Sequence, residues 1–209
     1  MSTFNCDFLV IGSGIGGLSY ALKVAEYGSV ILVTKTGLDE TNTAYAQGGI
    51  AAVTYEPDTT EKHLQDTLIC GDGLCNEAVV RMIVEEAPAQ INQLIQWGAK
   101  FDRKPNGQYD LAREGGHSEH RILHHKDNTG HEIQRALSDK ARKHHNIRLF
   151  ENFFAVEIIT QHHLGALVKR GDKDITCFGA YALDLKTQKV HTFLSKVTVM
   201  ATGGTGNIY

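Results

Sequence analysis

Residues 6–35 read CDFLVIGSGIGGLSYALKVAEYGSVILVTK, and this stretch decides the fold. The apolar runs Phe8–Ile11 and Val30–Val33 each predict a buried strand. Between them, a GxGxxG pattern begins at Gly12, and apolar residues then recur at helical spacing. A strand, a glycine-rich turn, a helix and a second strand in this order predict a βαβ unit that binds a dinucleotide.

Each glycine of the pattern is expected to have its own task. Gly12 would allow the tight turn, Gly14 would let backbone approach a pyrophosphate, and Gly17 would let the helix lie close to the strand. The helix N-terminus would face the diphosphate with its unpaired N–H groups and the positive end of its dipole. Gly28 is expected to end the helix.

Lys35 follows the second strand, where NAD and FAD folds usually carry an Asp or Glu that binds ribose hydroxyls. The missing carboxylate argues against ordinary NAD binding. A basic residue there could receive the 2′-phosphate of NADP, so an NADP-dependent reductase is an alternative. Lys35 could also be a solvated strand end, and spacing alone does not decide among these readings.

The chain has 209 residues, of which 42% are hydrophobic, and a formal net charge of −3. This size suffices for one good core, with room for a small appendage. A net negative chain offers no basic field for nucleic acid or an anionic membrane. It begins without a signal-like segment and has no apolar run that could cross a bilayer, so we expect a cytoplasmic protein. Its four scattered cysteines fit reduced thiols.

The middle of the chain predicts three further helices. The first is expected over 58–69, the second over Glu77–Trp97 with a break or kink near Pro88, and the third over Thr129–His145. In each, apolar residues recur at three-and-four spacing. We therefore interpret these helices as scaffold.

The C-terminal part predicts strands over 148–150, 153–160, 166–170, 178–185 and 190–200. The strands within 153–196 would form an antiparallel excursion that returns to the main sheet. The last strand runs into Thr202–Gly206, where backbone can approach a cofactor. The whole order predicts an α/β fold with a central parallel sheet.

Three stretches carry a resemblance to a known family: Val10–Leu18, Tyr45–Val53 and Arg113–Ser118. Asp127–Gly130 and Ala201–Gly204 follow in the family's order. The chain resembles the N-terminal part of the L-aspartate oxidases, flavoproteins of the succinate dehydrogenase and fumarate reductase superfamily. This resemblance implies a Rossmann-like FAD-binding domain over the whole chain, residues 1–209, with the excursion at 153–196 inside it and the family's capping domain absent.

FAD is the cofactor that the resemblance implies, and it would be bound without a covalent bond. The succinate branch attaches FAD through a His, and Asn42 stands at that place here. In this family a Lys at the position of Lys35 is usual beside FAD, which weakens the NADP reading. The expected cofactor-binding residues are Gly12, Ser13, Gly14, Ile15, Gly16, Gly17, Lys35, Asn42, Thr43, Ala44, Tyr45, Ala46, Gln47, Gly48, Gly49, Ala201, Thr202, Gly203 and Gly204.

Glu114 is the expected contact for the substrate amine. Succinate and fumarate enzymes commonly have Phe at this place, whereas a carboxylate suits the α-ammonium group of aspartate. The alternative is a surface carboxylate near Arg113 or Arg121. His117 and Ser118 would help position a substrate carboxylate or the flavin, and Arg121 is a weaker candidate for holding a carboxylate.

The sequence predicts no metal site. Five histidines lie close together between 117 and 131, but carboxylates and cysteines at ligand spacing are missing from this loop. Cys70 and Cys75 form a CxxxxC pair without a matching second pair. These residues are therefore expected to be structural or exposed.

The implied activity is oxidation of L-aspartate to iminoaspartate, with oxygen or fumarate as the acceptor. The product would feed quinolinate and NAD biosynthesis, with quinolinate synthase acting downstream. No catalytic residue is expected in this chain, because the family's acid or base arginine belongs to a later part. The fragment alone is expected to be inactive and to bind FAD weakly. An NADP-dependent reductase and a non-catalytic nucleotide-binding module are the alternatives.

Overall fold

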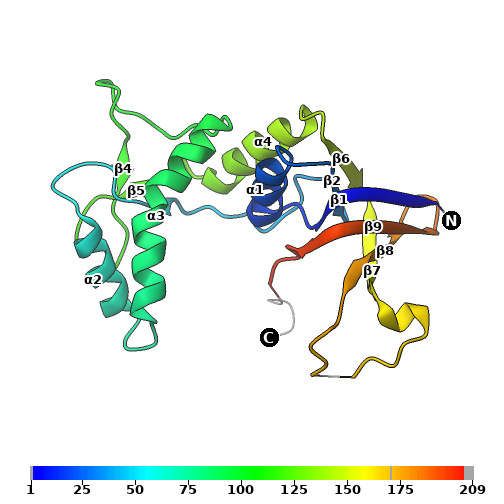
Figure 1. Cartoon of the computed structure of the whole chain (residues 1–209). Coiled ribbons are helices and arrows are strands. Elements are labelled where there is room, and N and C mark those ends of the chain that lie inside the picture. Colours follow the sequence, from blue (N-terminus) through cyan, green and yellow to red (C-terminus); the bar gives the residue numbers. More distant parts are fainter. Residues whose placement is uncertain (1, 170, 205–209) are drawn as a thin grey trace. The chain divides into compact units, whose positions relative to one another are not determined.

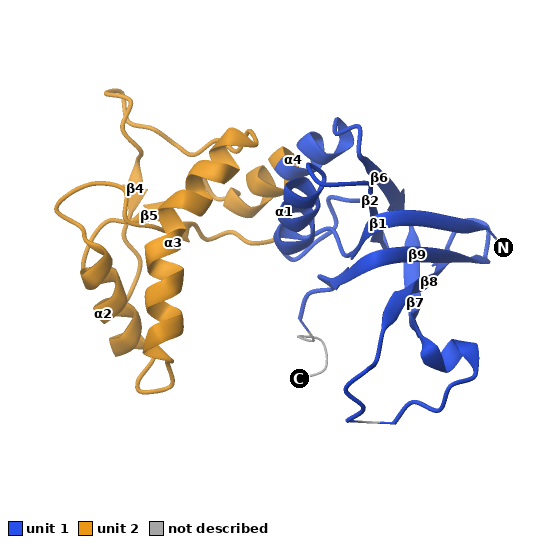
Figure 2. Cartoon of the chain, viewed as in Figure 1, with its two compact units in different colours: residues 1–43, 137–209 blue, residues 44–136 orange. Residues whose placement is uncertain are grey.

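The computed structural model describes residues 2–169 and 171–204, so residues 205–206 of the predicted cofactor approach lie outside the described residues. The chain divides into two compact units, coloured separately in Figure 2. Unit 1 comprises residues 1–43 and 137–209, and unit 2 comprises residues 44–136. No helix in the described residues combines the length and the apolar character that a membrane crossing needs.

Unit 1 contains a six-stranded sheet in the order β6-β2-β1-β9-β8-β7 (Figure 1). Neighbouring strands are parallel in its first four members, β6 (Ile147–Glu151), β2 (Val30–Thr34), β1 (Thr3–Ile11) and β9 (Lys189–Met200). Every residue of β2 is buried. A continuous apolar run of this kind is typical of a central parallel strand that is covered on both faces. The predicted α/β fold with a parallel sheet is confirmed.

Strand β1 begins at Thr3, five residues before the predicted start at Phe8. Its ladder with β9 continues to the pair Thr3 and Thr192, so backbone pairing extends the strand through residues whose side chains are less buried. The apolar run of the sequence marked only the buried half. Ladder hydrogen bonds with a neighbouring strand are not visible in a single segment's pattern.

The antiparallel excursion of the predicted fold is present. Strands β7 (Phe153–Thr160) and β8 (Cys177–Asp184) pair antiparallel, and β8 pairs antiparallel with β9. The strand predicted over 166–170 is wrong: residues 166–169 form no strand, and Arg170 lies outside the described residues. A short 3-10 helix, η1 (Gln161–Leu164), precedes this segment instead. The Gln161 side chain holds the end of the loop through the Asp174 carbonyl and the Thr176 N–H.

Helix α1 (Ile15–Val24) contacts β1 and β2 and buries Leu18, Ala21 and Leu22. Full burial of a leucine side chain contributes about 1.5–3 kcal/mol to stability, so this face ties the helix to the sheet. The helix ends at Val24, and the prediction that Gly28 ends it is wrong. A Cβ at Gly28 would lie 2.7 Å from an Asp7 oxygen, so close packing explains this glycine.

The other face of the sheet holds an aromatic core. Phe193 is fully buried, and its ring lies 5.1 Å from Phe4, 5.0 Å from Phe150 and 6.0 Å from Phe153 between centroids. These separations are typical of stacked and edge-on aromatic pairs. Side chains from β1, β6, β7 and β9 therefore pack together in this core.

Unit 2 places helices α2 (Thr60–Cys70) and α3 (Glu77–Gln96) against each other (Figure 1). Both have side-chain N-caps, Thr59 and Asn76, as polar residues at these positions favour. A break or a kink was predicted near Pro88. Helix α3 continues through Pro88 without a break, and its ribbon bends partway along in Figure 1.

The rest of unit 2 is a small sheet and the beginning of a helix. Its three strands lie in the order β3-β5-β4 and pair antiparallel. Their bounds are β3 (Ile50–Ala51), β5 (Ile122–Leu123) and β4 (Leu111–Ala112). Helix α4 (Thr129–Arg142) starts in this unit, and it ends three residues before the predicted His145. The small sheet brings segments near residues 50, 111 and 122 together.

Candidate functional site

The turn at residues 12–17 of unit 1, here called the glycine turn, has the backbone that its sequence predicts. Gly12 has φ +114°, and a Cβ there would lie 2.2 Å from the Ala201 carbonyl oxygen. A Cβ at Gly17 would lie 2.1 Å from the Gly12 oxygen. Both contacts are with backbone, which cannot move aside. The tight turn at Gly12 is confirmed. Gly17 was predicted to let the helix lie close to the strand, and it brings the helix against Gly12, the residue that directly follows β1.

The N-terminus of α1 is open to an anion. Gly14 is its N-cap and supplies no side chain. The Ile15 N–H donates to the Thr43 hydroxyl at 3.0 Å, and the first helical bond runs from the Leu18 N–H to the Gly14 oxygen at 3.0 Å. The N–H groups of Gly16 and Gly17 therefore precede the helical ladder. Such groups, together with the helix dipole, favour a phosphate at this end.

Three predicted segments meet around this helix end. The Ala201 N–H donates to the Ile11 oxygen at 2.8 Å, which sets the segment after β9 against the turn. A Cβ at Gly203, whose φ is +80°, would lie 3.8 Å from the Asn42 amide nitrogen. The glycine turn, residues 42–43 and residues 201–203 are thus neighbours within unit 1. A cradle bordered largely by glycine and backbone fits the phosphates of a dinucleotide.

Two predicted cofactor residues, Ser13 and Lys35, lie at the two ends of the contact between the glycine turn and β2 and differ in burial. The Ser13 side chain is buried, and its hydroxyl lies 3.0 Å from the Thr34 hydroxyl. Ser13 therefore joins the turn to the end of β2. Lys35 directly follows β2 and is exposed, as a strand-end residue near a ligand or near solvent would be.

Unit 2 contains a recess of about 330 Å³. Its lining residues come from the segments near 48, 112, 114, 122 and 126, and they are Gln47, Gly48, Gly49, Ala112, Glu114, Ile122, His124, Lys126 and Asp127. The two loops that carry the family resemblance, near Gln47 and Glu114, thus border one cavity. A Cβ at Gly48 would lie 3.9 Å from a Glu114 carboxylate oxygen.

The small sheet explains why these loops meet. Ile50 of β3 pairs with Leu123 of β5, and Leu111 of β4 pairs with the same residue. A Cβ at Gly49 would lie 2.4 Å from the Leu123 oxygen, so only glycine lets this loop approach β5 so closely. β5 therefore holds the Gln47 loop and the Glu114 loop on its two sides.

Two polar residues that sequence reasoning missed also line the recess. His124 and Lys126 follow β5, and the Lys126 N–H donates to Asp102 at 2.7 Å. Lys126 has φ +48°, a conformation that non-glycine residues rarely adopt. In the sequence, only the stretch Asp127–Gly130, which carries part of the family resemblance, pointed to this side of the recess. The recess is thus lined by two carboxylates, Glu114 and Asp127, and by the cation Lys126.

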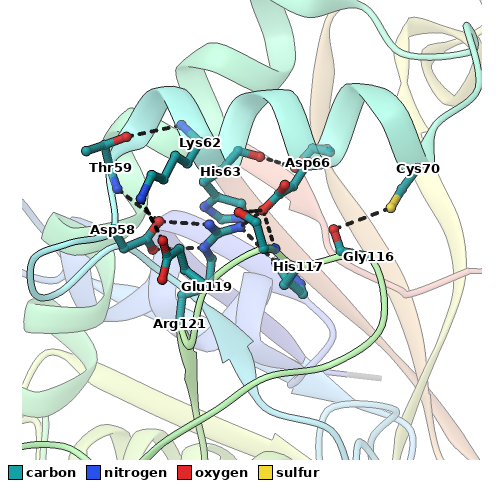
Figure 3. A network of polar contacts seen from close by, with 12 residues as sticks. Asp58, Thr59, Lys62, His63, Asp66, Cys70, Gly116, His117, Glu119 and Arg121 are labelled. Carbon is teal, nitrogen blue, oxygen red and sulfur yellow. Dashed lines mark hydrogen bonds and ion pairs between the residues drawn. The ribbon is translucent and has the colours of Figure 1, made fainter.

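The other predicted substrate residues lie beside a buried ion cluster and not among the lining residues of the recess (Figure 3). The Arg121 side chain is fully buried and donates to Asp58 through Nε at 2.8 Å and through Nη2 at 2.7 Å. Its Nη1 donates to Asp66 at 2.5 Å. With two carboxylates already bound, Arg121 has no capacity for a substrate carboxylate.

Ser118 and His117 are attached to the same cluster. The N–H and the hydroxyl of Ser118 both donate to Asp66 Oδ2 at 2.8 Å. Burial would raise the pKa of Asp66, but hydrogen bonds from Ser118 and Arg121 outweigh burial and lower it to about 2. Asp66 is therefore ionised at neutral pH. His117 lies with Nδ1 at 3.1 Å from Arg121 Nη1.

Comparison with known proteins agrees with the resemblance. The family model described as FAD binding domain matches residues 7–209. The chain is 48% identical over 208 residues to L-aspartate oxidase 2-a, chloroplastic, of Nicotiana tabacum, covering 100% of this chain and 31% of that protein. It is 46% identical over 209 residues to L-aspartate oxidase of Vibrio cholerae, covering 98% of this chain and 38% of that protein.

Solved structures show the same fold. A variant of E. coli quinol fumarate reductase matches with a TM-score of 0.87 and 30% identity, over 100% of this chain and 34% of that chain. Sdh1 of Mycobacterium smegmatis matches with a TM-score of 0.86 and 29% identity, over 100% of this chain and 35% of that chain. The chain therefore spans about a third of the length of the relatives and structures it matches.

Proposed function

The chain belongs to the FAD binding domain family, and we propose that the N-terminus of α1 holds the diphosphate of FAD. The observation that carries this proposal is the convergence of the glycine turn, the 42–43 segment and the 201–203 segment within unit 1. Backbone N–H groups and the helix dipole would bind the phosphates there.

The FAD contacts proposed in unit 1 are those of residues 12–17, Lys35, 42–43 and 201–204, and in unit 2 those of residues 44–49. Ser13 would contribute backbone alone, because its hydroxyl lies against Thr34. FAD would be bound without a covalent bond, because the amide of Asn42 has no nucleophilic ring nitrogen. Residues 1–209 would form one FAD-binding domain, with 153–196 as its antiparallel excursion.

We propose that the full-length protein oxidises L-aspartate to iminoaspartate. FAD, when bound, supplies a two-electron acceptor for such an oxidation. The support is the identity of 45–48% to plant L-aspartate oxidases together with a recess bordered by Gln47 and Glu114. Glu114 would pair with the substrate ammonium, and His117 with Ser118 would position the substrate or the flavin.

The remaining features follow from the same assignment. Oxygen or fumarate would accept the electrons, and a quinolinate synthase would use the product for NAD biosynthesis. The protein would act in the cytoplasm, although the plant relatives are described as chloroplastic. The acid or base arginine would belong to a part of the relatives that this chain does not span.

The test is an absorbance spectrum of the purified full-length protein with added FAD, followed by anaerobic aspartate. We expect flavin bands that shift on binding, release of free FAD by acid denaturation, and bleaching near 450 nm, roughly the oxidised flavin band, when aspartate is added. Succinate at the same concentration is the control and should leave the spectrum oxidised. If the protein binds NADPH and does not bind FAD, the reductase alternative is supported. If the folded protein binds neither, a non-catalytic module is supported.

A further inference from the structure

The charged cluster of Asp58, Asp66 and Arg121 has one positive and two negative groups, all largely buried. Two carboxylates around one guanidinium leave a net charge of −1. A substrate carboxylate would be repelled by such a cluster, and Arg121 offers it no free donor pair. The cluster therefore has another purpose than binding the substrate.

His117 lies against Arg121 in this cluster (Figure 3), and this contact determines the tautomer of its ring. Its Nδ1 lies 3.1 Å from Arg121 Nη1, and a guanidinium can only donate hydrogen bonds. Nδ1 must therefore be the acceptor, and the proton of the neutral ring lies on Nε2. The Nε2–H is therefore the remaining donor of the His117 ring. The contact between Nδ1 and Arg121 fixes the orientation of this ring.

The neighbouring His63 supports the same picture. It is 7% exposed, and its ring centroid lies 5.7 Å from that of His117. Burial, helped by the positive charge of Arg121 and by His117, lowers the pKa of His63 in spite of the nearby carboxylates Asp58 and Asp66. His63 is therefore neutral at pH 7 and packs beside His117 without repelling it.

The loop 113–118 is also pinned by packing against the end of α2. Gly116 has φ +83°, and a Cβ there would lie 2.3 Å from Cys70 Sγ. Cys70 and Asp66 lie one helical turn apart on α2, and they contact Gly116 and Ser118, on either side of His117. Gly116, His117 and Ser118 are thus fixed, and Glu114, two residues earlier, lines the recess.

We propose that Asp58, Asp66 and Arg121 are positioning residues that fix the loop 113–118. In the fixed loop, Glu114 faces the recess, and the His117 ring carries its proton on Nε2. The role of Glu114 in this proposal rests on the proposed function. The positioning itself rests on the contacts of unit 2. Asp66 is the central member, because its Oδ2 accepts from Ser118 twice and from Arg121.

The first test is hydrogen exchange in the full-length protein with Asp66→Ala. We expect the amides of 113–118 to exchange at least tenfold faster, while those of β1 keep their rates. Asp66→Asn retains an acceptor for Ser118 and should recover most of the protection. Glu61→Gln is the matched control, because Glu61 lies on the same helix but pairs with Arg81 at the surface.

The second test is kinetic. Asp66→Ala should raise the KM for aspartate about tenfold, a loss of roughly 1.4 kcal/mol in binding, with a smaller change in kcat. Combined with Glu114→Gln it should add little further, because both changes remove the same interaction. A purely structural role would lower the melting temperature and leave the KM unchanged.

The tautomer of His117 needs no variant, and nitrogen-15 spectra of the wild-type ring should show protonation at Nε2. Protonation at Nδ1, or unchanged loop exchange in folded Asp66→Ala, would overturn the positioning. If the wild type does not oxidise aspartate, the proposed function fails, and the exchange rates and the tautomer still decide the positioning.

Discussion

At the glycine turn of unit 1 the groups offered to a ligand are backbone N–H groups, whereas at the recess of unit 2 they are charged side chains. The glycine turn depends on the absence of Cβ atoms at Gly12 and Gly17. The recess is lined by the charged residues Glu114, Lys126 and Asp127, which lie near the strands of the small sheet. Substitutions at the glycine turn should therefore disrupt it through steric clash. Substitutions near the recess should disrupt it by leaving a charged group without its partner.

The largest effect is expected from Arg121→Met, which would leave Asp58 and Asp66 without their buried counterion. Removing one partner of a buried ion cluster costs about 3–5 kcal/mol in the free energy of unfolding. Urea unfolding followed by circular dichroism measures this loss. Arg81→Met is the control, because Arg81 pairs with exposed carboxylates and should change stability little. Equal losses in both variants would contradict a buried role for Arg121.

Gly17→Ala should have the next largest effect. The new Cβ would meet the Gly12 oxygen at 2.1 Å, and forcing the helix away from the turn should cost about 3 kcal/mol. Gly16→Ala is the matched control on the same turn of helix, with nothing within 4 Å of its Cβ. There the helix should gain up to about 1 kcal/mol. Thermal melts without added FAD would compare the two, and opposite signs are expected.

Glu114→Gln tests whether the Glu114 carboxylate at the recess binds the substrate. Losing a charge-assisted hydrogen bond to the substrate ammonium should cost about 1.5–3 kcal/mol, or roughly tenfold to hundredfold in KM for aspartate. FAD affinity should stay unchanged, because the glycine turn is untouched. Glu119→Gln is the control, since Glu119 pairs with Lys62. A similar rise in KM for both variants would contradict the assignment of Glu114.

The smallest effect concerns pH. The pKa of Asp66 is lowered to about 2 in the folded protein, below its ordinary value of about 3.9. Stability from ionised Asp66 is therefore fully present above about pH 4 and is lost as the pH falls toward 2. Wild type and Asp66→Asn should differ in unfolding midpoint at neutral pH and converge near pH 2. A constant difference across this window would show that the charge of Asp66 does not contribute.

The glycine turn could be predicted because its signal is local. The pattern starting at Gly12 lies between two apolar runs. The strand, the turn, the helix and the second strand that these residues predict all lie within residues 6–35. The errors lie where tertiary contacts decide. Helix α1 ends at Val24 and not at Gly28, and Gly28 instead packs closely against Asp7. The segment 166–169 has strand-like residues and forms no strand.

The site in unit 2 could be predicted only in part. Glu114 and Gln47 carry the family resemblance, and the recess brings them together. Lys126 and His124 were missed, because only their position after β5 places them at the recess. Arg121 was considered for a substrate carboxylate, and its two buried aspartates could not be foreseen from residues 63 and 55 positions away.

The sequence by itself determined the parallel α/β core, the glycine turn and the likeness to FAD-dependent oxidases, because these depend on local periodicity and on residue types at short spacing. Only the tertiary structure decided which carboxylates surround Arg121, which loops border the recess and where α1 ends. Those features arise from contacts between segments distant in the chain, and no local pattern records which of many polar side chains becomes buried beside another.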